Sequence, residues 1–412
     1  MSLSLLVGIS AGVITPQVCS AETHLHGIVD VRASSVNSSN SYLEGGQGKF
    51  TNKHGRHLSL AQAGAELSVL ADTGLSIHIV ANSYASDFRH SIGITEAYVK
   101  YKNLPNSAGY RFENRTGIFY PKISLENNAY AWASKNTLNS STLNTWIGEE
   151  IRVLGSEFSI TGLGQLQQHS YDWSITATIF INNDPSGALL AWHGWTQGAK
   201  QTLWTEKPKI AWFPARQPGH DLQYQAPNSD PFLELDHRPG AHITAEWKVH
   251  GIGAVSLGYY DNRAKPYIVI KGQYGWHTQF FHAGVEWVLA PTWQLIAQYL
   301  SGSTLMQNSS RQDVVNNNFN NGFVLLSKKW QKHTVTARLE HFSMTDNDQI
   351  QGDNNNESGR GLTLNYSYRL NKPMFISVEY NWISSDRPAH AYAGLANQLT
   401  EQQWQVALRY FF

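Results

Sequence analysis

The chain has 412 residues, and its 31 basic and 31 acidic side chains give a formal net charge of zero. A chain without excess charge has no general attraction for nucleic acid or for an anionic membrane surface, so neither class of binding is expected. Cys19 is the only cysteine and the 17 histidines are scattered, so we expect no disulfide, no metal ion and no cofactor.

The beginning of the chain has the pattern of an export signal. An apolar run from Met1 to Ile14 is too short to span a bilayer, and small residues precede a polar start at Glu22. This is typical of a secretory signal peptide with cleavage after Ala21, although the basic residue that usually precedes the run is missing. The pattern therefore predicts a signal peptide over 1–21 and one domain over 22–412.

Period-two alternation of apolar and polar residues recurs along the rest of the chain and predicts strands. In the segment from His24 to Ala33, for example, Leu25 and Val29 share one face while Asp30 and Arg32 share the other. The same alternation marks the segments 61–69, 75–82, 95–101, 110–120, 241–250, 281–287, 362–368 and 376–382. So many apolar faces exceed the need of one soluble core, whereas a transmembrane barrel places apolar residues against lipid and polar residues in its lumen.

The connections between these segments alternate between short and long. Short turns are expected near 71–74, 104–109, 155–156, 183–187, 251–253, 290–292, 331–333 and 370–373. This alternation indicates an all-β, antiparallel, up-and-down transmembrane barrel with short periplasmic turns and long external loops. The count is about 18 strands if Ala188 to Trp195 is a strand, and 16 if that segment and a neighbour are loop. A barrel this wide leaves an aqueous channel.

The last strand runs into the carboxyl terminus with one apolar face. That face consists of Trp404, Val406, Leu408, Tyr410 and Phe412. The ending resembles that of Gram-negative outer-membrane β-barrel proteins, which commonly finish on a terminal Phe after alternating apolar residues. The resemblance implies the outer membrane as location, recognition of these five residues by the barrel assembly machinery, and contact with membrane lipid and lipopolysaccharide. The alternative for this segment alone is a strand of a soluble sandwich.

The segment 121–143 is the candidate for a channel constriction. It follows the fifth predicted strand, where general and phosphate-selective porins fold a loop into the channel, and the stretch from Gly117 to Glu126 resembles the phosphate-selective porin group. By this similarity Lys122, Glu126 and Lys135 lie near the narrowest point, and a homotrimer is implied as the assembly. The alternative is that the loop stays on the external surface.

Charged residues of two neighbouring predicted strands form a second candidate site. Arg111, Glu113 and Arg115 share a face of the fifth strand, and Glu150 and Arg152 share a face of the sixth. Facing charges of both signs would create a field across a wet pore and give weak ion selectivity. The alternative is that these charges pair with one another and stiffen the wall.

Three function classes remain open on the sequence. The leading hypothesis is a porin for passive diffusion of small hydrophilic solutes or ions, which needs no catalytic residue. A non-conducting barrel that acts as a receptor, an adhesin or a sheath for a partner is the second class. An outer-membrane hydrolase is the third, but no nucleophile-elbow motif marks a catalytic serine, and we do not expect an enzyme.

Overall fold

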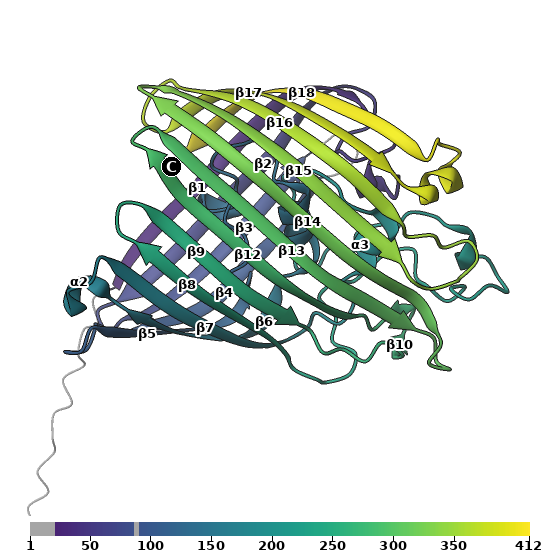
Figure 1. The fold of residues 1–412 in the computed structure, drawn as a ribbon, viewed down its shortest axis with the longest axis horizontal. Coiled ribbons are helices and arrows are strands. Elements are labelled where there is room, and N and C mark those ends of the chain that lie inside the picture. The colour runs from purple at the N-terminus through teal and green to yellow at the C-terminus, as the bar shows by residue number, and fades with distance from the viewer. Residues whose placement is uncertain (1–20, 86–89) are drawn as a thin grey trace, which may run out of the picture.

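The computed structural model describes residues 21–85 and 90–412. Sixteen antiparallel strands close into one barrel in which the first strand, β1, pairs with the last, β18 (Figure 1). The predicted signal peptide, 1–21, lies outside the described residues apart from Ala21, where β1 begins.

The barrel strands follow one another around the wall nearly in chain order. They are β1 (Ala21–Asn37), β2 (Gly55–Ala71), β3 (Leu75–Ala85), β4 (His90–Lys102), β5 (Tyr110–Phe119), β6 (Val153–Gly162), β7 (Tyr171–Ile181), β8 (Gly240–Val249), β9 (Gly253–Asp261), β12 (His277–Ala290), β13 (Trp293–Gln307), β14 (Asp313–Trp330), β15 (His333–Asp346), β16 (Glu357–Arg369), β17 (Met374–Asp386) and β18 (Gln398–Phe411).

The remaining elements are short and lie in the connections. They are the α-helices α1 (Thr142–Glu150), α2 (Gly164–Gln167) and α3 (Ala188–His193), the small sheet of β10 (Val269–Ile270) and β11 (Gln273–Tyr274), and the 3-10 turns η1 (Tyr42–Glu44), η2 (Tyr130–Trp132), η3 (Pro214–Arg216) and η4 (Pro388–Ala393). In Figure 1, α2 and the carboxyl terminus lie at one end of the barrel, and α3 and β10 lie at the other.

The outer face of the wall is apolar and exposed. Leu257, Phe281 and Leu339 are 61%, 68% and 63% exposed. The polar residues that alternate with such apolar residues along the strands point inward and are buried. A closed sheet pairs the backbone groups of neighbouring strands, and an apolar band around it suits contact with hydrocarbon. Together with the fold, this band places the protein in a Gram-negative outer membrane. Within the described ranges, no helix combines the length and apolar character needed to cross a membrane.

The sixteen strands match the lower of the two counts that the sequence allowed, because Ala188 to Trp195 is not a strand. Most of it forms helix α3, buried inside the barrel end. The run Ala-Leu-Leu-Ala-Trp is apolar on all sides, and periodicity cannot distinguish a buried strand from a buried helix in so short a segment.

Two of the predicted short turns are also wrong. Residues 155–156 lie inside β6, and 183–187 begin the long connection that joins β7 to β8. The short turn that follows β6 instead contains α2 and spans 163–170. Both errors follow from assigning Glu150 and the segment that begins at Ala188 to strands, whereas these residues belong to helices α1 and α3.

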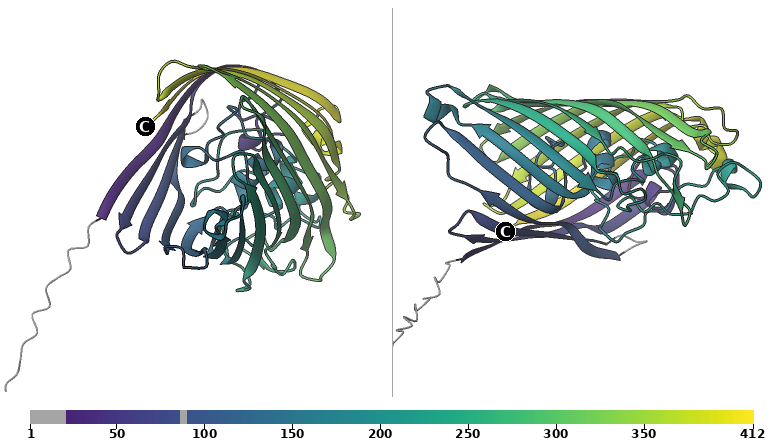
Figure 2. Two further views of the ribbon diagram at one scale, coloured as in Figure 1. Left: turned by 60° about the vertical axis from the view of Figure 1, so that its left-hand side comes forward. Right: turned by 90° about the horizontal axis from the view of Figure 1, so that it is seen from below.

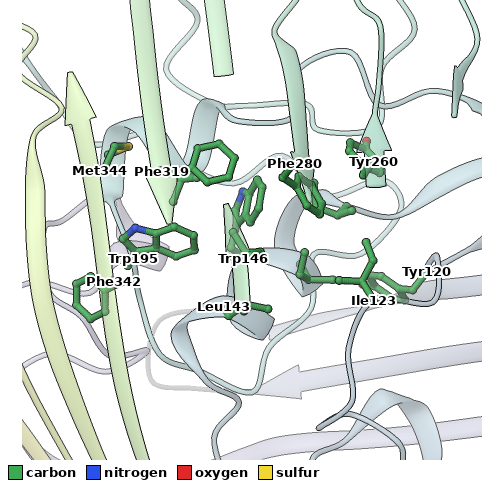
Figure 3. Packing of buried hydrophobic residues seen from close by; sticks show 14 of the residues in the cluster. Tyr120, Ile123, Leu143, Trp146, Trp195, Tyr260, Phe280, Phe319, Phe342 and Met344 are labelled. Carbon is green, nitrogen blue, oxygen red and sulfur yellow. The ribbon is translucent and has the colours of Figure 1, made fainter. Parts of the chain in front are cut away.

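The interior of the barrel contains a hydrophobic cluster built from two long connections and the inner wall. Figure 2 shows chain from these connections, 120–152 and 182–239, within the curve of the sheet. Trp146 of α1 packs edge-on against Trp195 and Phe319, with ring centroids 5.8 and 5.2 Å apart (Figure 3). The Trp146 side chain is therefore buried in the lumen.

Candidate functional site

The connection between β5 and β6 crosses the lumen and contacts strands on different sides of the wall. The Lys122 carbonyl oxygen accepts a hydrogen bond from Thr244 on β8 at 3.4 Å. The Ala131 carbonyl oxygen accepts one from Gln62 on β2 at 2.8 Å, and the Leu138 N–H donates to Glu379 on β17 at 2.5 Å. The loop therefore crosses the lumen and narrows it.

Two glycines of the inner wall receive side chains of this loop. A Cβ atom built on Gly64 would lie 2.3 Å from the Ala131 Cβ, and one built on Gly284 would lie 2.4 Å from the Leu125 Cδ1. Any larger wall residue would collide with the loop at these points. The close approach shows that loop and wall are packed as complementary surfaces.

Three arginines of the wall hold the carbonyl groups of segment 134–140. Arg32 on β1 donates to Leu138 at 2.8 Å, and Arg409 on β18 donates to Ser134 at 3.0 Å. Arg338 on β15 donates to the Asn139 and Ser140 carbonyl oxygens at 2.9 and 3.1 Å. Because each donor is charged and buried, these bonds are stronger than ordinary amide hydrogen bonds.

Carboxylates of the wall and the loop complete the network. Glu379 accepts from the N–H groups of both Leu138 and Asn139, and Glu340 accepts from the Thr142 N–H at 2.6 Å. Glu126 of the loop pairs with Arg338 and accepts from the Ser141 N–H at 2.9 Å. Each of these backbone groups would otherwise be buried without a partner, which is costly.

Cavities lie on the two sides of this segment. A vestibule of about 700 Å³ at the short-turn end is lined in part by Thr137 and Arg409. A cavity of about 60 Å³ toward the other end is lined in part by Arg32, Asn139 and Gln405. Leu138 lies between Thr137 and Asn139, so the strip of loop around it separates the two spaces.

The charges predicted on the fifth strand lie on the lumen side of β5, and two of the three are paired. Glu113 pairs with Lys100 of β4 at 2.8 Å. Arg115 donates to both carboxylate oxygens of Glu157 on β6, at 2.8 and 3.0 Å. Arg111 lies nearer the short-turn end and is half-buried. The structure therefore joins Glu113 and Arg115 to neighbouring strands.

The three loop residues that the sequence singled out occupy different environments. Glu126 is buried in the network with Arg338. Lys122 is exposed, and Lys135 lines the vestibule. They do not form one ring at one depth.

The expectation that Glu150 and Arg152 share a strand face is wrong. Glu150 is the last residue of α1, and its carboxylate accepts from the N–H groups of Gly187 and Leu189 at the beginning of α3, both at 2.9 Å. The Arg152 guanidinium is fully buried, 4.1 Å from the centre of the Phe232 ring. Both residues therefore join the two lumen connections to each other.

Burial perturbs the acid–base properties of this junction. It raises the pKa of Glu150 to about 7, against the opposing effect of the bonds from Leu189 and Trp146. It also raises the pKa of Glu149 well above the ordinary value, with a contribution from the nearby Glu150 charge. Burial lowers the pKa of His193 to about 3, although its Nε2 lies 3.5 Å from Glu149. The junction thus favours the uncharged forms of these groups.

Three carboxylates in the described loops approach closely enough to be considered as cation ligands. They belong to Asp184, Glu234 and Asp236. Asp184 accepts from the Leu235 N–H, Glu234 from the His237 N–H and Asp236 from the Arg238 N–H. Burial raises the pKa of Asp184 to about 7 against the opposing hydrogen bond from Leu235, and the Glu234 charge adds to the rise. Backbone donors and a proton on Asp184 can therefore stabilise the cluster.

Sequence reasoning missed most of the residues that hold the loop. They are Asp30, Arg32, Arg338, Glu340, Glu379 and Arg409. All six lie on the polar face of a strand with clear alternation, so their inward orientation could be inferred. The signal that was missing is the partner, because a loop more than 100 residues away in sequence supplies it.

No protein-family model and no curated protein sequence matches the chain. Among solved structures, it is similar to the outer membrane channel DcaP of Acinetobacter baumannii, with a TM-score of 0.57 and 12% identity over 95% of this chain and 97% of that one. It is also similar to the anion-selective porin from Comamonas acidovorans, with a TM-score of 0.53 and 13% identity over 95% and 100% of the chains. At these identities the similarity concerns the fold, and the chain has the fold of the outer-membrane porins.

Proposed function

We propose that the protein is a porin that admits small hydrophilic solutes or ions through the outer membrane. The observation that carries this proposal is the closed barrel of sixteen strands, which is too wide for its own wall side chains to fill. Its inward face is polar, and a vestibule of about 700 Å³ enters it from the short-turn end. A polar inward face of this kind normally lines a water-filled path through a barrel.

The constriction of this channel is the segment 121–143. We infer that solute passes the strip around Leu138 when this strip moves away from Arg32 and Glu379. Mixed charges at the wall, such as the Arg115 and Glu157 pair, support weak ion selectivity. The channel therefore opens through displacement of the loop, with the strands as a fixed frame.

A non-conducting barrel is the second candidate, and the firmly held loop inside the lumen favours it. The loop is held by charged hydrogen bonds from several strands and packs into the wall at Gly64 and Gly284. A barrel whose loop never moves would serve as a receptor, an adhesin or a sheath for a partner.

Conductance of the refolded full chain in planar lipid bilayers separates the two candidates. A porin gives stepwise openings, and a variant with residues 129–140 replaced by a short glycine and serine linker gives larger ones. If both proteins fold, as judged by heat-dependent mobility in detergent gels, and neither conducts, the porin proposal is wrong. Hydrolysis of a generic ester without openings would point to the enzyme class.

We infer three further properties from the resemblance of the sequence to porins. The segment 1–21 is removed as a signal peptide, the assembly machinery recognises the apolar face from Trp404 to Phe412, and the protomers form a homotrimer in contact with lipopolysaccharide. The mass of the exported chain tests the first property. The mass of the complex in mild detergent tests the third, and a monomer would contradict it.

A further inference from the structure

The vestibule at the short-turn end has the size and enclosure of a ligand site. Its volume of about 700 Å³ lies within the range of small-molecule pockets. The periplasmic ends of β12 to β18 form its wall, and part of the inward loop, from Asn128 to Thr137, forms its inner end.

The charge of this cavity has one sign. Among its described lining residues there are five cations and no carboxylate. The cations are Lys135, Lys329, Lys332, Arg369 and Arg409. They come from the loop, from three strands and from one turn, so the positive charge surrounds the cavity. A cleft lined by one sign of charge concentrates ions of the other sign.

Four of these cations have no acidic partner among the described residues, and one of the four, Lys332, donates to the Leu370 carbonyl oxygen at 3.4 Å. No described carboxylate forms an ion pair with Lys135, Lys329 or Arg369. Arg409 differs, because its Nε lies 3.2 Å from Asp30 and it also donates to the loop. The charges of Lys135, Lys329 and Arg369 therefore remain available to a ligand.

Two carboxylates of the wall lie close to this cavity without lining it, and Glu286 accepts its hydrogen bond from a lining residue. Glu286 accepts from the Gln294 amide at 2.6 Å, and Glu379 accepts from the loop N–H groups. Neither lines the vestibule. The five cations that line the cavity outnumber these two carboxylates, so its net charge stays positive.

Aromatic side chains supply an apolar side to the same cavity. Phe375 and Phe411 both line it, with perpendicular rings whose centroids are 5.8 Å apart, and Tyr130 of the loop lines it as well. The Arg409 guanidinium lies 5.3 Å from the centre of the Phe411 ring. A flat organic body could pack against these rings while its anionic group meets the cations.

We propose that the vestibule binds small organic anions with an aromatic body, of the aryl carboxylate class, as they pass the periplasmic mouth. The proposal deepens the porin function and names the solute class. It rests on two features that coincide in one cavity, namely unpaired cations and apolar rings. A bare inorganic anion would use only the first of these, and an aromatic cation only the second.

Equilibrium titration of the full refolded chain in detergent tests the proposal with three probes: benzoate, inorganic phosphate and benzylammonium. Calorimetry at low ionic strength should show the tightest binding for benzoate, weaker binding for phosphate and none for benzylammonium. The double variant Lys329→Gln with Arg369→Gln should weaken benzoate binding about tenfold, because two charges are lost at short range. The Lys372→Gln variant, in the exposed turn after β16, serves as the matched control and should bind as the parent does.

Three results would overturn the proposal: equal binding of benzoate and benzylammonium, tighter binding of phosphate than of benzoate, or unchanged benzoate affinity in the folded double variant. Because these titrations need no membrane, their failure is distinguishable from failure of the porin function. If the protein conducts but does not bind benzoate, only the proposal of an anion site is wrong. If it binds benzoate but does not conduct, only the proposal of a channel is wrong.

Discussion

Arg32 on the first strand donates a hydrogen bond from its Nη2 to the carbonyl oxygen of Leu138, at 2.8 Å, across 106 residues of sequence. Its guanidinium is held in turn by Asp30, with an Nη2 to Oδ2 distance of 2.8 Å. The barrel wall thus fixes the loop by its backbone, so the side chain at 138 need not be polar. Because every residue has a backbone carbonyl oxygen, the sequence does not indicate which one accepts this hydrogen bond.

Weakening this contact should favour the open channel. We expect Arg32→Gln to raise the fraction of time spent open, since a charged hydrogen bond contributes about 1.5–3 kcal/mol and a neutral amide restores only part of it. Single-channel recording provides the measurement. Arg360→Gln, on the exposed face of β16, is the control and should leave gating unchanged. Equal open times in the two folded variants would refute the loop as the constriction.

A larger side chain at Gly64 should push the loop away from the wall. Its added atoms would overlap the Ala131 Cβ, so Gly64→Val is expected to increase conductance or the exposure of the loop to protease. Ala63→Val, one residue earlier on the outer face of β2, carries the same added bulk into lipid and should have little effect. A Gly64→Val barrel with the parent's conductance and protease resistance would contradict the close packing described above.

The Arg115 and Glu157 pair should influence the sign of ion preference. Arg115→Gln removes the cation and leaves the buried Glu157 carboxylate, so the reversal potential in a salt gradient is expected to shift toward cation preference. The companion Glu157→Gln change should shift it in the opposite direction. If neither folded variant changes the reversal potential, the pair has only a structural role at the wall.

The stability of the docked loop should fall as the pH rises from about 4.5 to about 7. The pKa of Glu150 is raised from 4.5 to about 7 by burial. Glu150 in the docked loop therefore keeps its proton up to about pH 7, whereas Glu150 in the released loop loses it above pH 4.5. The stabilisation of the docked loop is complete below pH 4.5 and is lost as the pH rises through 7. The full effect of this shift is about 3 kcal/mol.

Tryptophan fluorescence across this pH range can follow the docking, because Trp146 donates to Glu150 at 2.7 Å. The Glu150→Gln variant should lose this part of the pH dependence, and its single amide oxygen can still accept from Trp146 and Gly187, whereas its NH2 group cannot accept from Leu189. Glu149 acts in the same direction and leaves a residual slope. A variant that follows the parent's curve would exclude Glu150 as the titrating group.

Removal of the terminal ring should impair assembly in cells more than folding in vitro. Phe412 exchanges two backbone hydrogen bonds with Gly27, at 3.0 and 3.1 Å, which close the barrel between β1 and β18. Phe412→Ala keeps both bonds, so refolding into detergent should proceed, whereas the amount of protein in the outer membrane should fall. Phe281→Ala, an outward aromatic in the middle of the wall, is the control for lost apolar surface. Equal yields of the two variants in membranes would contradict a terminal signal.

Local alternation determined the fold class of this protein. In the terminal strand, every second residue from Trp404 to Tyr410 is exposed while Gln403, Gln405 and Arg409 between them are buried, as the apolar and polar faces predicted. A strand in a membrane wall has one lipid face and one lumen face, so the alternation of apolar and polar residues along it indicates which side chains face lipid and which face the lumen. The same logic failed at α3, where burial on all sides removed the periodicity.

Only the tertiary structure decided what fills the barrel and which charges meet. Arg338 and Glu126 are 212 residues apart and lie on a strand and a loop, and no local pattern relates them. Arg115 and Arg152 are both cations beside the same predicted loop, yet one pairs with Glu157 at the wall and the other lies against the Phe232 ring. Periodicity reports which way a side chain points, whereas its partner depends on how a long connection folds back through the lumen, and that path is set by contacts distributed around the whole wall.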